Sequence, residues 1–214
     1  MSKHNIHISK QAGFNIIELM VVLFVASILM SIGIPAFNGF MANNRMSTSA
    51  NDMAITLHVA RTESIKRRAN VTICPSTEWS DNSPDCTDSD FSDGWIVFVD
   101  AVAPALPDLA HNGPQDIIYT HGPMHETITL SVADDLAPLG NDPFLVFGPN
   151  GFPLNALAGN DTVFNFQLCD MRGNQDTGGG VSAGRWIQIT PTGRPQIYRE
   201  VNQVQAAANP SNGC

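Results

Sequence analysis

An uncharged, mostly apolar stretch covers residues 19–44, and Glu18 stands directly before it. About 20 apolar residues are enough to cross the hydrocarbon core of a bilayer as an α-helix. The stretch therefore predicts one membrane-spanning helix close to the N-terminus. A carboxylate at the start of such a helix is costly in lipid, which makes Glu18 a candidate functional residue.

The residues around Glu18 resemble a known processing signal. Residues 11–20 read Gln-Ala-Gly-Phe-Asn-Ile-Ile-Glu-Leu-Met, an order that resembles the class III signal of type IV pilins and pseudopilins. The resemblance implies that prepilin peptidase cuts after Gly13 and that Phe14 is then N-methylated, with Glu18 as the fifth mature residue. An ordinary secretory signal is cut after its apolar core, whereas a cut at Gly13 keeps the helix on the mature chain.

The same cut indicates a role for Glu18. It leaves a free amine on Phe14, one helical turn from the carboxylate. A carboxylate in lipid needs a partner, and the amine of a neighbouring subunit would supply one. We therefore expect Glu18 to set the axial register of a helical filament. The alternative is a simple signal anchor, in which Glu18 only lies near the membrane interface.

Charge predicts how the chain is oriented in the membrane. Residues 1–13 hold Lys3 and Lys10, so 9 of the 11 basic residues remain after cleavage against 20 acidic ones, a net charge of −11. Lysines before the span and an acidic body after it predict a cytoplasmic N-terminus. We expect a single-pass protein of the bacterial inner membrane, with its C-terminal domain in the periplasm, assembled into a pilus or pseudopilus.

The hydrophobic pattern, together with the cleavage and assembly that the resemblance implies, divides the chain into four segments. They are a cleaved leader at residues 1–13, a transmembrane and filament-core helix at 14–44, an amphipathic continuation of that helix at 45–70 and a β-domain at 71–214. In the continuation, apolar and small residues recur at three- and four-residue steps, which predicts one helical face packed on a sheet. These residues are Met46, Ala50, Met53, Ala54, Leu57, Ala60, Ser64 and Ile65.

After residue 70 the pattern changes to short β-type runs divided by Gly, Pro, Asn and Asp. The predicted strands lie at residues 71–74, 95–99, 117–121, 127–132, 144–147, 163–168, 186–190 and 196–199. We read a hairpin turn between the last two runs. The predicted fold class is α+β and pilin-like, with a long N-terminal membrane-spanning helix packed on an antiparallel β-sheet domain.

Blocks beyond the leader narrow the resemblance to the GspH/FimT family of type IV minor pilins and type II secretion pseudopilins. The matching blocks lie at residues 61–68, 71–74, 94–100, 147–151 and 187–194. The family implies a structural subunit near the tip or initiation complex of a filament, with other minor pilins or pseudopilins as partners. Type II secretion protein H and a type IV pilus minor subunit remain alternatives.

Four cysteines form an even set in a chain predicted to be exported, where disulfides are favoured. Three pairings are open, and sequence alone does not choose between them. We prefer Cys74–Cys86, which closes a short polar loop, and Cys169–Cys214, which ties the C-terminal tail to a strand. A zinc site is the alternative, but no Cys-x-x-Cys or His/Cys spacing supports it.

The sequence contains no enzyme motif such as Gly-x-Ser-x-Gly, a phosphate-binding glycine loop or His-Glu-x-x-His. We predict a protein that is not an enzyme and needs no cofactor or metal. His111, His121 and His125 are one metal-site alternative, weakened by the Gly-Pro between the last two. The six carboxylates of residues 78–93 are a second, for calcium, but they miss the EF-hand spacing.

DNA is a less favoured partner. Some DNA-uptake minor pilins of this family carry a C-terminal Gly-Arg-x-Arg element that binds DNA, and residues 193–199 read Gly-Arg-Pro-Gln-Ile-Tyr-Arg. Arg194 and Arg199 are therefore candidates, with Arg185 and Arg172 as neighbours in space. In one extended strand Arg194 and Arg199 face opposite sides. Beyond residue 70 these four arginines stand against seventeen carboxylates, which repel DNA. A turn-and-strand role, with Arg199 paired to a carboxylate, is favoured.

Overall fold

The computed structural model describes residues 13–87, 89–100, 116–132, 144–154, 164–211 and 213–214. The chain falls into two compact units, residues 1–41 and residues 42–214. The first unit holds the start of a long helix. The second holds the rest of that helix and all of the strands described below.

Helix α1 (Ile16–Arg67) contains 52 residues and continues through Pro35. Asn15 stands before its first turn, where the side-chain oxygen accepts a hydrogen bond from the backbone N–H of Ile17 at 3.3 Å. Such an N-cap satisfies one of the backbone donors that a helix leaves unpaired at its start. The helix ends where Arg68 takes a positive φ of 52°, a conformation typical of the residue after a helix.

Two antiparallel sheets of four strands each follow the helix. The first sheet has the order β3-β2-β1-β5 and consists of β1 (Asn70–Pro75), β2 (Trp95–Asp100), β3 (Ile117–His121) and β5 (Leu145–Phe147). The second has the order β4-β6-β7-β8 and consists of β4 (Thr129–Val132), β6 (Phe164–Cys169), β7 (Val181–Ile189) and β8 (Pro195–Glu200). A long helix followed by antiparallel sheets confirms the predicted fold class.

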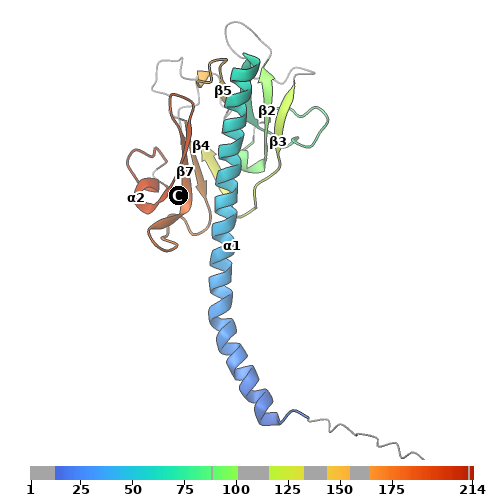
Figure 1. The fold of residues 1–214 in the computed structure, drawn as a ribbon, viewed down its shortest axis with the longest axis vertical. Helices are drawn as coiled ribbons and strands as arrows, with labels where there is room; N and C mark the ends of the chain where they lie inside the picture. Colours follow the sequence, from blue (N-terminus) through green and yellow to red (C-terminus); the bar gives the residue numbers. More distant parts are fainter. Residues whose placement is uncertain (1–12, 88, 101–115, 133–143, 155–163, 212) are drawn as a thin grey trace, which may run out of the picture. The chain divides into compact units, whose positions relative to one another are not determined.

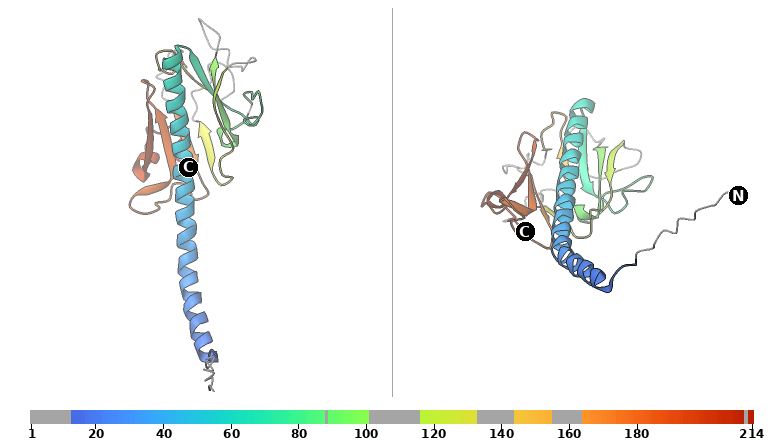
Figure 2. Two further views of the ribbon diagram at one scale, coloured as in Figure 1. Left: turned by 45° about the vertical axis from the view of Figure 1, so that its right-hand side comes forward. Right: turned by 60° about the horizontal axis from the view of Figure 1, so that its bottom comes forward.

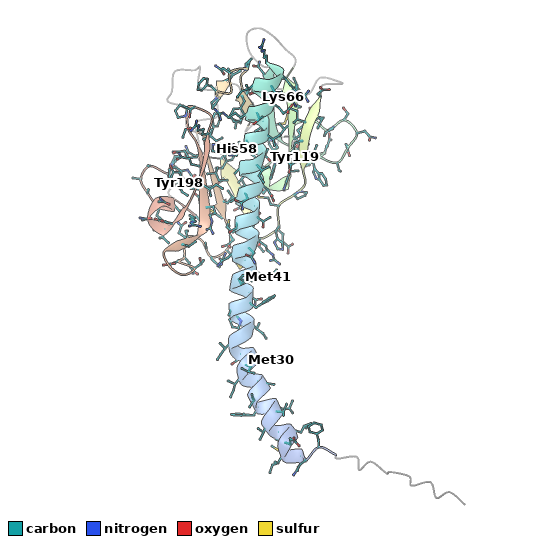
Figure 3. The ribbon with its side chains drawn as sticks, viewed as in Figure 1. Met30, Met41, His58, Lys66, Tyr119 and Tyr198 are labelled. Atoms are coloured by element: carbon teal, nitrogen blue, oxygen red, sulfur yellow. A yellow bond between two sulfur atoms is a disulfide. The ribbon has the colours of Figure 1, made fainter. Side chains whose placement is uncertain are left out.

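The main core lies between α1 and the two sheets. Met46, Met53 and Leu57 of the helix are fully buried against apolar side chains from both sheets. Figures 1 and 2 show this part of α1 with β7 on one side and β2 and β3 on the other. Tyr119 of the first sheet and Tyr198 of the second accordingly lie on opposite sides of the helix in Figure 3. One helical face thus joins both sheets into a single core.

The predicted helical face is largely correct, but Ala54 is only half-buried and Ile65 departs further. Ile65 is 47% exposed rather than buried. Its side chain lies over Gly151, where an added Cβ would be 2.6 Å from the end of the isoleucine. Thr56, which the apolar pattern passed over, is fully buried instead. The buried face therefore includes a polar residue that needs a hydrogen-bond partner.

Most strands have the predicted positions, and β3 has the predicted bounds. The main difference is β7, which begins at Val181 rather than at residue 186. Glycines at 178–180 indicate a loop, but Val181 already pairs with Glu200 of β8. Two short helices, η1 (Phe91–Asp93) and α2 (Val201–Val204), were not predicted. Each is too short for a periodic pattern to reveal.

The β7–β8 hairpin has the predicted turn. The Gly193 N–H donates to Thr190 O at 2.7 Å, and the Thr190 N–H donates to Arg194 O at 3.0 Å. Gly193 has a φ of 75°, and an added Cβ would collide with the carbonyl oxygen of Gly151. Glycine is therefore required at this position both by the backbone conformation and by space.

Candidate functional site

The predicted processing residues precede α1. Gly13 and Phe14 lie outside any helix or strand, and Phe14 is 80% exposed. Glu18 lies in the first turn of α1, where the helix dipole favours a negative charge. Among the described residues, no basic side chain forms an ion pair with Glu18. Cleavage, methylation and the register role of Glu18 remain predictions.

The first part of α1 exposes an apolar surface. Large apolar side chains of α1 from Ile16 to Phe40 are about half exposed or more. Met30, which is labelled in Figure 3, lies in this part of the helix. Within the described part of the chain, α1 is the one helix that is long and apolar enough to cross a membrane. An apolar surface of this size is not left in water by soluble proteins.

All four cysteines are paired, Cys74 with Cys86 and Cys169 with Cys214, with Cα–Cα distances of 5.6 and 5.5 Å. These are the two pairings that we preferred from the sequence. None of the four remains as a thiolate to hold zinc. An added Cβ on Gly184 would lie 2.6 Å from Cys214 Sγ, so the absence of a side chain there makes room for the second disulfide.

The three arginines singled out as DNA-binding candidates do not form one cluster. Arg194 follows the β7–β8 turn and is exposed. Arg199 lies near the opposite end of β8, and Arg185 lies in the neighbouring β7. Arg185 and Arg199 both line one pocket, and Arg194 does not. The structure thus brings together two of the three residues.

This pocket has a volume of about 630 Å³ and is formed by α1, the turn before β7, and the strands β7 and β8. We call it the arginine pocket. Its lining residues are Asn43, Ser47, Ala50 and Asn51 of the helix, Thr177 and Gly178 of the turn, Val181 and Arg185 of β7, and Ile197 and Arg199 of β8. All of them belong to the unit of residues 42–214.

Arg185 is the most buried charge of the arginine pocket, with 6% of its surface exposed. Its Nη1 donates to the carbonyl oxygens of Ser182 and Gly184, the latter at 2.8 Å. Burial lowers the pKa of Arg185 below its ordinary value, and the like charges of Arg172 and Arg199 lower it further, while Asp170 acts in the opposite direction. The guanidinium therefore lies in a positive local field.

Arg172 already has a counter-ion. Its Nη2 and Nε lie 2.6 and 2.9 Å from Asp170 Oδ2, and its Nη1 donates to Asn43 Oδ1 at 2.7 Å. Arg199, by contrast, pairs with no carboxylate of the described residues. The sequence-based expectation that Arg199 is paired to a carboxylate is therefore wrong. The reason is that the strand register directs it to the arginine pocket.

The helical side of the arginine pocket was missed from the sequence. Asn43, Ser47 and Asn51 recur at four-residue steps along α1, a spacing that places them in one row on the helix. This polar row lies beside the buried helical face that contains Met46 and Met53. Its spacing was the sequence signal that could have revealed this wall of the pocket. It did not stand out because polar side chains on an amphipathic helix are ordinarily solvated.

The histidines and acidic residues considered for metals have other contacts. The His121 ring stacks on Trp95 with centroids 3.9 Å apart, its Nε2 lies 3.6 Å from Asp52 Oδ2, and its Nδ1 lies 2.6 Å from Gly122 O. His125 Nδ1 lies 2.9 Å from Thr127 Oγ1. No group of three His, Cys, Asp or Glu residues suited to a metal occurs in the described part of the chain. His111, and Asp88 of the acidic loop, lie outside it.

An exposed apolar helix whose second part packs on antiparallel sheets defines this chain as a pilin-like protein. The chain belongs to the family described as Type II transport protein GspH, which matches residues 49–193. This confirms the resemblance to the GspH/FimT group of minor pilins and pseudopilins. Members of that group are structural subunits rather than enzymes.

The chain is also similar in structure to the type IV minor pilin FimU of Pseudomonas aeruginosa PAO1. In one crystal form the identity is 19% and the TM-score 0.47, with 74% of this chain and 92% of FimU covered. In a second form the identity is 18% and the TM-score 0.43, with 71% and 91% covered. No curated protein sequence matches the chain.

Proposed function

We propose that this chain is a minor subunit of a type IV-like filament, working either in type II protein secretion as protein H or in a type IV pilus. The observation that carries the proposal is the exposed apolar part of α1, which needs lipid before assembly and other apolar helices after it. The proposed location is the bacterial inner membrane, with the sheets in the periplasm. The proposed partners are other minor pilins or pseudopilins.

We propose that maturation and assembly use the four segments that were predicted from the sequence. Prepilin peptidase removes residues 1–13, Phe14 is methylated, residues 14–44 form the filament core, and residues 45–70 join this core to the β-domain at 71–214. Exposure of Phe14 and its place before the helix support access by a processing enzyme. The new amine of Phe14 then pairs with Glu18 of a neighbouring subunit.

Replacement of Glu18 tests this assembly role. We expect Glu18→Val to be processed normally but lost from sheared filaments, because the amine of the neighbour then has no carboxylate partner. Immunoblots of membrane and filament fractions measure both steps. Glu78→Val, the same change in an exposed loop, is the matched control and should be incorporated. Normal incorporation of Glu18→Val would contradict the register role.

A gene deletion decides between the two machines. Loss of exoprotein secretion with normal twitching motility would assign the subunit to a secretion pseudopilus, and the reverse would assign it to a pilus.

DNA uptake scored in the same strains tests the alternative function, DNA binding through Arg185, Arg194 and Arg199. Arg199 is exposed and has no carboxylate partner among the residues that the structure describes, which favours this alternative. The separation of Arg194 from the arginine pocket weighs against it.

A further inference from the structure

We propose that the arginine pocket binds a carboxylate carried by a peptide segment of a neighbouring filament subunit. Arg185 and Arg199 supply the positive charge, and the helical row of Asn43, Ser47 and Asn51 forms the opposite wall. The identity of the peptide's source rests on the proposed function as a filament subunit. The chemistry of the ligand rests on the pocket alone.

Neither guanidinium group of the pocket has a carboxylate partner among the described residues. A guanidinium has five N–H donors, and the described contacts of Arg185 use only Nη1, toward Ser182 and Gly184. Its Nε and Nη2 have no acceptor among the described residues, although the residue is 94% buried. Arg199 is similarly without an acidic partner in the described chain. A buried charge without a counter-ion is costly, so the site is built for an anion.

Asp170, the acid whose charge acts on Arg185, does not fill this role. Asp170 lowers the positive field at Arg185, but its Oδ2 accepts two hydrogen bonds from Arg172, and its Oδ1 accepts one from the Arg172 backbone N–H at 2.9 Å. Its hydrogen-bonding capacity is thus largely taken. Arg185 and Arg199 are left for a ligand that comes from outside.

The shape and lining of the arginine pocket favour a carboxylate on a peptide. The planar fork of arginine binds a carboxylate through two parallel hydrogen bonds. Around it, Ser47, Asn51 and Thr177 offer amide and hydroxyl groups that suit peptide N–H and C=O groups, while Ala50 and Ile197 offer apolar contact. A volume of about 630 Å³ lies within the range of small-ligand sites and holds a few residues rather than a duplex.

Acidic residues around the arginine pocket disfavour a polyanion. Asp176 holds the turn beside the pocket through hydrogen bonds from the Gly178 and Gly180 N–H groups at 2.8 and 3.1 Å. Glu200 directly follows Arg199, and the chain carries a net charge of −9. A nucleic acid strand extends charge over this acidic surface and is repelled. One carboxylate on a short segment meets only the two arginines.

The position of the arginine pocket along α1 indicates the source of the peptide. Its helical wall, residues 43–51, comes directly after the apolar segment. When subunits assemble through their apolar segments, the chain of one subunit comes close to the residues that follow the apolar segment of its neighbour. A neighbouring subunit is therefore the nearest supply of a peptide carboxylate.

The binding chemistry can be tested on the full chain in detergent micelles by NMR of arginine Nε–H groups. The probe is the peptide acetyl-Gly-Ala-Gly-Glu with a free C-terminus. We expect saturable shifts at Arg185 and Arg199 with millimolar affinity. Arg199→Gln should weaken binding about tenfold, the loss of one charge-assisted pair, and Arg199→Lys should restore part of it. Arg45→Gln removes an exposed charge from the same helix outside the pocket and should change affinity less than twofold.

Three results would overturn the proposal. The first is equal binding of the neutral peptide acetyl-Gly-Ala-Gly-Gln amide, which would show that charge is not recognised. The second is Arg199-dependent binding of a dT12 single strand without binding of the acidic peptide, which would assign the pocket to nucleic acid. The third is binding of inorganic phosphate alone, which would show an adventitious anion site.

A second measurement tests whether the ligand belongs to a neighbouring subunit. Charge reversal by Arg199→Glu should reduce incorporation into filaments at least fivefold, while Arg45→Glu is incorporated normally. Normal incorporation of Arg199→Glu, in cells where Glu18→Val is excluded, would refute the pocket proposal and leave the filament function intact. Normal incorporation of Glu18→Val would instead refute the proposed register role, and the peptide titration would not depend on that outcome.

Discussion

At the scale of single residues, Thr56 links the helix to the first sheet through a hydrogen bond inside the core. Its Oγ1 accepts from Trp95 Nε1 at 3.0 Å and donates to Asp52 O at 2.9 Å. Both Thr56 and Trp95 are fully buried. A buried indole N–H without an acceptor is costly, so one hydroxyl lets a large aromatic residue pack against the helix.

Replacement of Thr56 by valine keeps the shape and removes the acceptor. We expect Thr56→Val to lower the free energy of unfolding by about 1–3 kcal/mol, because the Trp95 N–H is left unsatisfied. Thr62→Val is the matched control, since Thr62 makes the same bond to the preceding turn but is exposed. Urea unfolding of the full chain in mild detergent, followed by tryptophan fluorescence, measures both. Equal losses in the two variants would contradict the proposed role of the indole bond.

At the scale of elements, ion pairs connect the end of α1 to β3. Glu63 lies 2.7 Å from Arg67 Nε and 2.9 Å from Lys66 Nζ, and Arg67 Nη1 lies 2.5 Å from Asp116, next to β3. Hydrogen bonds from Arg67 and then Lys66 lower the pKa of Glu63 below its ordinary value of 4.5. Basic residues in the last turn also suit the helix dipole.

The lowered pKa of Glu63 has a predictable pH dependence. A carboxylate with a lower pKa in the folded state adds stability above its unfolded pKa, near 4.5, and loses this contribution as pH falls through the folded pKa. Glu63→Gln should therefore lower the urea midpoint at pH 7 and have less effect at pH 3. The Glu63 side chain is partly exposed, so we expect a small effect, weakened by salt. An equal effect at both pH values would argue against the ion pairs.

The two disulfides connect elements over different lengths of chain. Cys74–Cys86 joins residues 12 apart, and Cys169–Cys214 joins residues 45 apart. We assume that each disulfide acts by reducing the conformational entropy of the unfolded chain. Replacing both of its cysteines by serine should then lower the free energy of unfolding by about 3 kcal/mol for the first disulfide and about 4 kcal/mol for the second. Comparing urea unfolding of the two double variants tests this order. A larger loss for Cys74–Cys86 would indicate that local packing, rather than chain entropy, dominates.

At the scale of the whole molecule, the unit of residues 42–214 shares one core among three elements of structure. The helix face, the first sheet and the second sheet all contribute buried apolar residues to it. A second cluster, with Ile96, Phe98 and Val146, lies on the other face of the first sheet beside the Cys74–Cys86 disulfide. We therefore expect the two sheets to unfold together when the helix contact is weakened.

Leu57 tests this shared core, because it is fully buried in the cluster that both sheets enter. Leu57→Ala should lower the free energy of unfolding by about 2–5 kcal/mol through lost burial and a cavity. Ile55→Ala removes a similar side chain from the exposed side of the same helix and should have little effect. Tryptophan fluorescence and far-UV circular dichroism should give one coincident transition in Leu57→Ala. Two separate transitions would show that the sheets are independent.

The chain determines by its local pattern those features that depend on neighbours in sequence. The uncharged stretch after Glu18 can be seen directly in the sequence. The apolar row through Met46, Met53 and Leu57 follows the helix period, and the alternation in β4 follows the strand period, which a single segment carries by itself. Membership of the GspH family follows from such blocks in order. The position of Ile65 and the start of β7 were missed, because each depends on a partner distant in sequence, Gly151 and Glu200.

How these segments meet depends on contacts between residues far apart in the sequence. The tertiary structure divided the strands into two sheets on one helix, selected among three disulfide pairings, and turned Arg185 and Arg199 toward the same pocket while Arg194 stayed outside. The physical reason is that a pocket is lined by residues from separate segments, and strand register sets which of them face it. The sequence alone thus determines a membrane helix and the class of subunit. The fold determines that Arg185 and Arg199, which lie in different strands, line one pocket.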